Sequence, residues 1–319
     1  MMTADRAAIA AATRCLGAGG LVAFPTETVY GLGADATNGT AIARLYAAKG
    51  RPAFNPLIAH VADAAAARRL ARFDAAAERL TALWPGPLTL VLPKSADNSI
   101  ADLATAGLDT IAVRVPGHTV ARDILRLFGR PIVAPSANRS GHVSPTTAEH
   151  VRADLRGRID LIVDGGPTSV GLESTIVGCL DGGPVLLRPG GIPREAIEQL
   201  LGHTLAPSAA PTDDHAPLAP GQLASHYAPR ARLRLDADAV RAGEALLAFG
   251  QTLPPGAEAA VATRNLSPAA DLVEAAANLF LHLRTLDSTG ATTIAVMPVP
   301  PTGLGEAIND RLQRAAAPR

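Results

Sequence analysis

Residues 21–61 read LVAFPTETVYGLGADATNGTAIARLYAAKGRPAFNPLIAHV, and they decide the fold class of this chain. The apolar run Leu21–Phe24 predicts a buried strand, which ends at Pro25 because proline cannot donate a hydrogen bond to a sheet ladder. A helix is predicted from about Asn38 to Lys49, and the run Leu57–Ala59 predicts a second strand. A strand, a helix and another strand in this order are typical of α/β proteins.

Polar and charged side chains gather between these two strands. Five that carry hydroxyl or carboxyl groups follow the first strand: Thr26, Glu27, Thr28, Tyr30 and Asp35. Lys49, Arg51 and Asn55 follow the helix, and the second strand closes on His60. Because open α/β sheets form their sites at strand ends, we expect a binding site here.

Gly31–Ala36 matches the G-x-G-x-x-A dinucleotide fingerprint in its letters, but its surroundings do not fit. The glycines should directly follow a strand, whereas residues 25–30 intervene. No Asp or Glu occurs between Asp35 and Asp63, where the ribose-binding acid would stand. We therefore expect a glycine turn. The chain also has no G-x-x-x-x-G-K-[ST] sequence, which excludes a P-loop kinase or ATPase.

The composition is that of a globular protein. Its 319 residues suffice for two ordinary domains, and 48% are hydrophobic against 18% charged. The formal net charge is +0 and only 3% of residues are aromatic, so the chain offers neither a global positive field nor many base-stacking side chains. Any contact with RNA would need a local basic patch.

The cysteines and the N-terminus predict a cytoplasmic protein with no membrane partner. Cys15 and Cys179 give neither a disulfide framework nor zinc spacing, and we expect buried thiols in a reducing compartment. Residues 1–14 lack the apolar core of a signal peptide, and no window approaches the ~18 consecutive apolar residues of a membrane span.

The rest of the chain continues the α/β pattern and then changes character. Further helices are predicted at 3–17, 63–83 with a break near 73–74, 119–128, from 144–146 with Thr146 and Glu149 as a capping box, and 193–201. Further strands are predicted at 88–92, 110–116, 131–135, 159–163, 174–177 and 185–188. We divide the chain into a catalytic domain at 1–205, a Pro- and Ala-rich linker at 206–230 and a small α/β domain at 231–319.

Lys49 and Arg51, combined with Ser136 and Asn138, form the best candidate site. Two cations, a hydroxyl and an amide at strand or helix ends can clamp a nucleotide triphosphate. Only two of the 29 basic side chains are lysines, and a compact ammonium suits a phosphate. Taken singly, each of these residues would more simply be an ordinary exposed polar side chain, and His60 would be a structural imidazole. No carboxylate cluster has metal-site spacing, so any Mg²⁺ would arrive with the phosphates.

Several ordered motifs, taken together, resemble the YrdC-like threonylcarbamoyl-AMP synthases. The motifs are FPTETVYGL at 24–32, KGRP at 49–52 with NPL at 55–57, WPGPLT at 84–89, AVRVP at 112–116, APSAN at 134–138, STIV at 174–177, LRPG at 187–190, APG at 219–221 and SHYAP at 225–229. They span about residues 5–230, and the linker motifs with a trailing domain resemble the long two-domain form of that family.

The resemblance implies a fold, a reaction and a set of site residues. The fold would be a twisted, open mixed sheet with a large basic cavity, followed by the linker and a small Rossmann-like domain. The reaction would join L-threonine, bicarbonate or CO₂ and ATP into threonylcarbamoyladenylate and pyrophosphate, for threonylcarbamoyladenosine modification of tRNA. Lys49 and Arg51 would be the catalytic cations, and Tyr227 would fold over the cavity as part of a lid.

The implied ligand contacts divide into two groups. The residues that would bind ATP are Lys49, Arg51, Asn55, Thr110, Ser136, Asn138, Ser144, Arg188 and Tyr227. Those that would surround threonine are Thr28, His60, Arg114 and Ser174, with Arg114 as partner of the carboxylate. Glu173 has two open roles, as a capping residue or as a neighbour of magnesium.

Two alternatives stay open beside the synthase. One is a double-stranded RNA- or tRNA-binding module that uses the basic concave face. The other is a carbamoyltransferase-like maturation activity, although this chain lacks the acyl-phosphatase and zinc segments of such proteins. Partners among tRNAs or tRNA-modification proteins fit either the synthase or the binding module.

Overall fold

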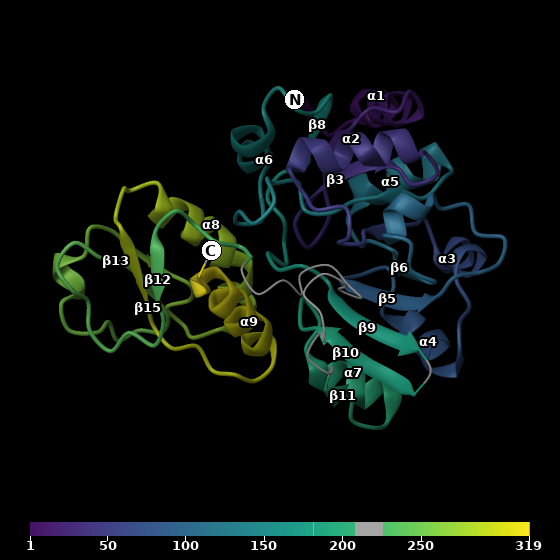
Figure 1. Cartoon of the computed structure of the whole chain (residues 1–319). Coiled ribbons are helices and arrows are strands. Elements are labelled where there is room, and N and C mark those ends of the chain that lie inside the picture. The colour runs from purple at the N-terminus through teal and green to yellow at the C-terminus, as the bar shows by residue number, and fades with distance from the viewer. Residues whose placement is uncertain (181, 208–225, 319) are drawn as a thin grey trace.

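The computed structural model describes residues 1–180, 182–207 and 226–318, and it contains two α/β domains that lie side by side (Figure 1). The large domain is built on a mixed sheet with strand order β1-β8-β2-β3-β7-β4-β6-β5-β9-β10-β11. Its strands are β1 Met2–Thr3, β2 Val22–Pro25, β3 Tyr30–Asp35, β4 Ile58–His60, β5 Leu88–Pro93, β6 Thr110–Arg114, β7 Ile132–Val133, β8 Leu161–Asp164, β9 Thr175–Leu180, β10 Gly183–Arg188 and β11 Ala206–Pro207.

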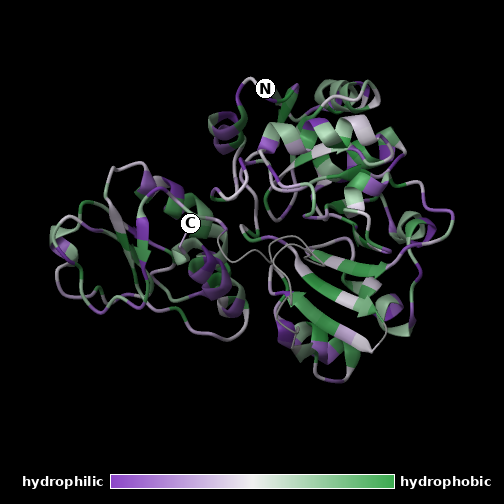
Figure 2. Cartoon of the chain, viewed as in Figure 1, coloured by the Kyte–Doolittle hydropathy of each residue, from purple (hydrophilic) through white to green (hydrophobic). Residues whose placement is uncertain are grey.

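Helices cover one face of this sheet and only part of the other. They are α1 Arg6–Gly17, α2 Gly39–Lys49, α3 Ala64–Leu70, α4 Ala75–Leu80, α5 Thr119–Phe128, α6 Ala148–Leu155 and α7 Arg194–Leu201, with short 3₁₀ turns at Thr81–Leu83 and Asp102–Thr105. Apolar residues of α2, α3, α4, α6 and α7 share one core with the sheet, whereas α1 and α5 form a second core with β2. Figure 2 shows hydrophobic residues along the strands of this sheet.

The small domain has a parallel sheet of order β12-β15-β13-β14, which is the Rossmann-like arrangement that was predicted. Its elements are β12 Arg232–Arg234, β13 Ala245–Ala248, the 3₁₀ turn Ala257–Ala259, β14 Thr263–Asn265, α8 Leu272–Asp287, β15 Thr293–Val296 and α9 Leu304–Ala316. The mixed sheet followed by a smaller α/β domain confirms the predicted fold class.

The two domains are tightly packed. Val29, Val143 and Leu172 of the large domain are buried in the same apolar cluster as the core of the small domain. At Gly171, a Cβ atom would lie 2.5 Å from the Ala276 carbonyl oxygen of α8, so only glycine permits this approach. None of the helices in the described ranges is long and apolar enough to cross a membrane.

The helix α2 confirms the local sequence signals. The Asn38 side chain accepts hydrogen bonds from the amides of Thr40 and Ala41, which are otherwise unsatisfied at a helix start. Gly50 ends the helix in the left-handed region at φ +61°. The predicted break near 73–74 is confirmed as well, because α3 and α4 are separate helices.

The predicted glycine turn at Gly31 and Gly33 is wrong. Both residues lie in β3, which pairs antiparallel with β2 so that Gly33 is opposite Val22 and Tyr30 is opposite Pro25. A Cβ atom at Gly33 would lie 2.6 Å from Cε1 of Phe24, so this glycine permits close packing within the sheet. The hairpin that β2 and β3 form places Thr26–Val29 at its tip.

Two other boundaries differ from the prediction. The capping box of Thr146 and Glu149 is wrong, because Thr147 caps α6 by accepting from the His150 amide, and Glu149 pairs with Arg152. The strand β11 adds in parallel to β10 within the stretch assigned to the linker. Most of that linker, including the APG motif and Ser225, lies outside the described residues.

Candidate functional site

A narrow cavity lies on the face of the large sheet that α1 and α5 cover only in part. Alternation along the strands points Ile58 and His60 of β4, and Arg114 of β6, toward this side. Its lining residues are Thr28, Val29, Arg51, Ile58, His60, Arg114, Ala134, Pro135, Ser136, Glu173, Ser174, Arg188, His226 and Tyr227. The sheet brings these residues together from segments far apart in sequence, because His60 pairs with Arg114 across β4 and β6.

Arg114 is buried and already has a carboxylate partner. Its Nη2 donates to Glu27 Oε1 at 2.6 Å, and its Nη1 donates to Thr28 Oγ1 at 3.1 Å. Burial would raise the pKa of Glu27, but the Arg114 charge and hydrogen bonds lower it below its usual value. The hairpin tip therefore presents Thr28 and a charge-compensated arginine to the cavity.

His60 is a neutral imidazole in this setting. It is 2% exposed, and its Nδ1 lies 3.2 Å from the Ile58 carbonyl oxygen. Burial and the neighbouring Arg114 charge lower its pKa to about 3. Across the physiological range it carries no charge toward the cavity.

The K-x-R motif lies at the end of α2, and both of its cations donate hydrogen bonds to neighbouring loops. Lys49 Nζ donates to the carbonyl oxygens of Ser136 and Asn138, each at 2.5 Å. Arg51 Nη2 donates to Asn55 Oδ1 at 2.6 Å and to the Pro56 carbonyl oxygen at 3.0 Å. Burial lowers the pKa of Lys49 well below its usual value and that of Arg51 to about 10.

Ser174 contacts the hydroxyl group of Thr89 and the guanidinium of Arg188. Its Oγ lies 2.7 Å from Thr89 Oγ1, while Arg188 Nη2 donates to the Ser174 carbonyl oxygen at 2.9 Å. This contact requires Gly190, where a Cβ atom would lie 2.4 Å from the Glu173 carbonyl oxygen. The LRPG turn thus brings Arg188 against Ser174, the residue that precedes β9.

Glu173 was left without a role by the sequence, and the structure gives it two partners. Its Oε1 accepts from Ser144 Oγ at 2.5 Å, and its Oε2 pairs at 2.8 Å with Arg311 Nε of α9. Burial raises the pKa of Glu173, but Arg311 and Arg188 outweigh it, and the net pKa is lowered. Glu173 is therefore an ionised residue in contact with the small domain.

His226 and Tyr227 belong to the cavity wall. The Tyr227 ring is 1% exposed and stacks on Phe280 with ring centroids 5.6 Å apart, and the His226 ring stands edge-on to it at 3.9 Å. The remaining volume is about 50 Å³, far below the ~300 Å³ or more typical of ligand pockets. In this structure the cavity is thus much smaller than the large one that was expected, and these two rings form part of its wall.

Several buried polar atoms near the cavity have no hydrogen-bond partner among the described residues. They are Asn138 Oδ1, His226 Nδ1, Tyr227 Oη and Arg311 Nη2. Buried polar groups are normally hydrogen-bonded, so each of these atoms is available for a contact with a ligand or an ordered water. No group of three or more His, Cys, Asp or Glu residues that could hold a metal occurs in the described part of the chain.

The predicted residues divide by position. The cavity wall contains all four predicted for threonine, together with Arg51, Ser136, Arg188 and Tyr227. Four more predicted residues are buried but do not line the cavity: Lys49, Asn55, Asn138 and Ser144. Each makes a hydrogen bond with a residue that lines the cavity or with a loop next to it. Thr110 lies at the far end of β6, where it pairs with Pro93, and is not brought to the cavity.

Sequence reasoning missed Glu173 as a cavity residue, His226 and the small-domain Arg311. His226 had a signal, since it directly precedes Tyr227 in the SHYAP motif. Arg311 had none, because it is 138 residues from Glu173 and belongs to no motif. Cys179 is buried as expected, whereas Cys15 is half-buried.

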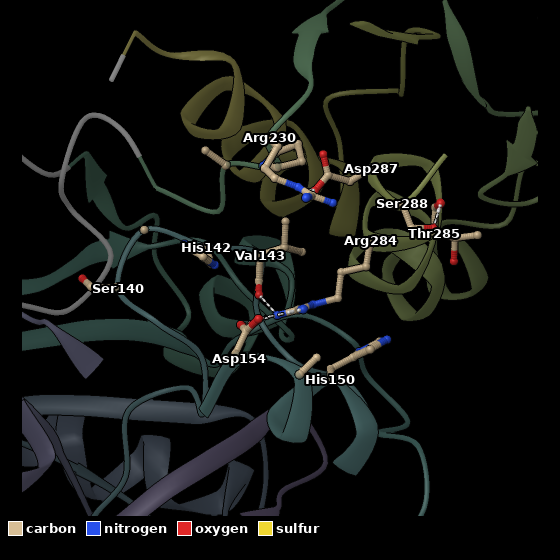
Figure 3. Close-up of a pocket in the computed structure, with 14 residues that line it drawn as sticks. Ser140, His142, Val143, His150, Asp154, Arg230, Arg284, Thr285, Asp287 and Ser288 are labelled. Atoms are coloured by element: carbon tan, nitrogen blue, oxygen red, sulfur yellow. Dashed lines mark hydrogen bonds and ion pairs between the residues drawn. The ribbon is translucent and has the colours of Figure 1, made fainter. Parts of the chain in front are cut away.

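A second cavity of about 810 Å³ lies between α6, the loop at 140–143 and α8. Figure 3 shows Arg284 of α8 reaching Asp154 of α6 and the Val143 carbonyl oxygen. Arg230 pairs with Asp287 on the same wall. Each of these two arginines has a carboxylate partner, so this larger space does not concentrate positive charge.

Comparisons with known proteins agree with the architecture. A family model described as "Telomere recombination" matches residues 14–190, and one described as "Threonylcarbamoyl-AMP synthase, C-terminal domain" matches residues 192–317. The chain is 42% identical to a threonylcarbamoyl-AMP synthase of Bacillus subtilis, over 98% of this chain and 93% of that protein. It is 44% identical to one of Pyrococcus abyssi, over 94% and 92% of the two chains.

Solved structures extend the likeness to three dimensions. The crystal structure of P. abyssi Sua5 complexed with L-threonine matches with a TM-score of 0.89 at 39% identity, over 99% of this chain and 96% of that one. E. coli YciO matches the fold of the large domain alone, with a TM-score of 0.53 at 22% identity over 59% of this chain and 93% of that one.

A mixed sheet with an arginine-lined cavity on one face and a parallel-sheet domain packed beside it defines the long, two-domain form of the YrdC-like α/β proteins. Within that class, the chain belongs to the threonylcarbamoyl-AMP synthase family.

Proposed function

We propose that this protein synthesises L-threonylcarbamoyladenylate from L-threonine, bicarbonate or CO₂ and ATP, and releases pyrophosphate. The convergence of Thr28, His60, Arg114 and Ser174 with Arg51 and Arg188 on one cavity carries the proposal. The likeness to a protein solved with L-threonine supports it. The adenylate would serve threonylcarbamoyladenosine formation in tRNA, with tRNA-modification proteins as partners in the cytoplasm.

The chemistry asks the protein to position anions rather than to supply a nucleophile. The threonine amine captures CO₂ and loses a proton to give a carbamate. A carbamate oxygen then attacks the α-phosphorus of ATP, a P–O bond forms, and pyrophosphate leaves with the bonding electron pair. Fixed cations and hydroxyl donors stabilise the charge that develops at phosphorus.

Each group of residues would act at a different part of the substrates. Arg114 and the hydroxyls of Thr28 and Ser174 would bind threonine beside the neutral His60. Lys49, Arg51, Ser136 and Asn138 would hold the phosphates, with Lys49 shaping the loop through its two carbonyl contacts. Asn55, Ser144, Arg188 and Tyr227 would complete the nucleotide side. Thr110 lies outside the cavity, and its contact with ATP stays a prediction.

The cavity must open before ATP binds, because about 50 Å³ cannot hold a nucleotide. The rings of His226 and Tyr227 would have to withdraw from it. Tyr227 has φ +62°, a strained value for a residue with a side chain, so its present position depends on the surrounding packing.

Mg²⁺ would arrive on the triphosphate and neutralise charge on the phosphate oxygens. The lining carboxylate, Glu173, is engaged by Arg311 and Ser144, which fits a metal carried by its ligand better than a resident ion. The RNA-binding alternative is not favoured, since Lys49, Arg114 and Arg188 are each less than 5% exposed and do not form a surface patch.

The direct test is pyrophosphate release by the purified protein with ATP and Mg²⁺. Release that requires both threonine and bicarbonate, with formation of the adenylate followed by chromatography, is the expected result. Release that persists without threonine, or no release under any combination, contradicts the proposal.

A further inference from the structure

Arg311 of α9 reaches out of the small domain to the wall of the cavity. Its side chain is 0% exposed, and its Nε contacts Glu173 Oε2 at 2.8 Å. Its Nη1 bonds to Asp310, and its guanidinium carbon lies 5.2 Å from the centre of the Tyr227 ring. The third nitrogen, Nη2, is buried and has no hydrogen-bond partner in the described ranges.

Glu173 is the reason that this arginine matters to the site. It is the one carboxylate among the described residues that line the cavity, and it directly precedes Ser174. Threonine carboxylate, carbamate and triphosphate are all anions, and an uncompensated buried carboxylate beside them would repel each one. A buried charge without a partner is also destabilising in itself.

The partners of Glu173 show how its negative charge is compensated. One oxygen accepts a hydrogen bond from the Ser144 hydroxyl, which fixes the direction of that hydroxyl, and the other accepts from Nε of Arg311. Arg188, the other cation near Glu173, is turned to the backbone and hydroxyl of Ser174. The cation that is hydrogen-bonded to Glu173, Arg311, therefore comes from the small domain.

We propose that Arg311 is a positioning residue for the nucleotide side of the site: it neutralises Glu173 and holds it against Ser144, so that the small domain completes an anion-binding cavity in the large one. This inference rests on the proposed function for the identity of the anions. It gives α9 a role in substrate affinity beyond packing.

The test measures ATP affinity by calorimetry in the full-length chain, with threonine- and bicarbonate-dependent pyrophosphate release as a separate readout. Arg311→Met removes the charge and keeps most of the volume. We expect it to weaken ATP binding roughly 10- to 100-fold, because Glu173 is left unpaired. Adding Glu173→Gln removes the stranded charge and retains an acceptor for Ser144, and we expect ATP affinity to return to within about threefold of wild type.

Arg194→Met is the matched control. Arg194 of α7 forms another ion pair between the domains, with Glu306 on the same helix as Arg311, but both side chains are about 30% exposed and neither lines the cavity. Breaking that pair should leave ATP affinity unchanged. An equal loss in this control would show that any disturbance of α9 docking has the same effect, and it would overturn the inference.

The remaining outcomes are decisive too. Normal ATP affinity in Arg311→Met, or a loss that Glu173→Gln does not rescue, would mean that Arg311 acts by packing alone. If Arg311→Met does not fold, Glu173→Gln alone must keep ATP affinity within about threefold, and a tenfold loss refutes the idea. Arg311-dependent ATP binding without adenylate synthesis would sustain this inference while the proposed function fails.

Discussion

The two cavities of this protein differ in size and in how their charges are paired. The larger, about 810 Å³, has its two arginines on Asp154 and Asp287. The smaller, about 50 Å³, is lined by three arginines, Arg51, Arg114 and Arg188, and, among the described residues, by a single carboxylate, Glu173. The difference teaches that convergence of cations and hydroxyl donors, and not volume, is the criterion by which we propose the smaller cavity as the anion site.

The largest expected effect comes from Arg51→Ala in the small cavity. Arg51 is held by Asn55 and Pro56 so that its guanidinium faces the site, and its loss removes a fixed cation from the developing charge. We expect adenylate synthesis to fall roughly 100- to 1,000-fold, as when one oxyanion donor is lost. Steady-state pyrophosphate release measures this, and near-normal activity would remove the distinction between the two cavities.

Arg284→Met tests the large cavity and should change stability instead of activity. It leaves Asp154 and the Val143 carbonyl oxygen without their partner, both near the domain boundary. We expect the free energy of unfolding to drop by about 1–3 kcal/mol. Urea denaturation measures the drop, and a loss of synthesis exceeding that of Arg51→Ala would show that the large cavity is the reacting one.

The pH dependence of stability should report His60 in the small cavity. Because its pKa is about 3 in the folded state and 6.5 when unfolded, the unfolded state binds the proton first as pH falls. The stabilisation is complete above pH 6.5 and is lost toward pH 3, at about 1.4 kcal/mol per pH unit. His60→Gln should flatten this slope in denaturation series, and an unchanged slope would assign the titration elsewhere.

Arg230→Ala should have the smallest effect. Its side chain is 83% exposed, and its pair with Asp287 spans 3.4 Å at the rim of the large cavity. Such pairs contribute little, and we expect unfolding free energy within about 0.5 kcal/mol of wild type with unchanged synthesis. This variant is also the control for Arg51→Ala, because it removes an arginine from the other cavity. An equal loss of activity would argue that the convergence of charges does not identify the substrate site.

The sequence predicts a feature well where interactions between neighbouring residues determine it, and poorly where contacts between distant segments do. The helix α2 was predictable because Asn38 and Gly50 act on their own neighbours. The strand β3 was not, because its two glycines favour a turn locally, whereas pairing with β2 and β7 holds this segment in the sheet. The N-cap of α6 was misplaced by one residue, since Thr146 and Thr147 offer the same hydroxyl and only the fold selects between them.

The candidate site shows the same division. Motifs located Thr28, His60, Arg114 and Ser174 because each belongs to a recognisable local run. Thr110 shares a strand face with Arg114 by alternation, yet it lies four residues along β6 and away from the cavity. Arg311 depends on the docking of two domains, which no local pattern encodes.

The close approach at Gly171 has a thermodynamic consequence. With the backbone of α8 against this residue, and with Val29, Val143 and Leu172 inside the small-domain cluster, residues of the large domain complete the core of the small one. Separating the domains would expose apolar surface on both sides. We therefore expect the two domains to unfold as one cooperative unit, in a single calorimetric transition rather than domain by domain.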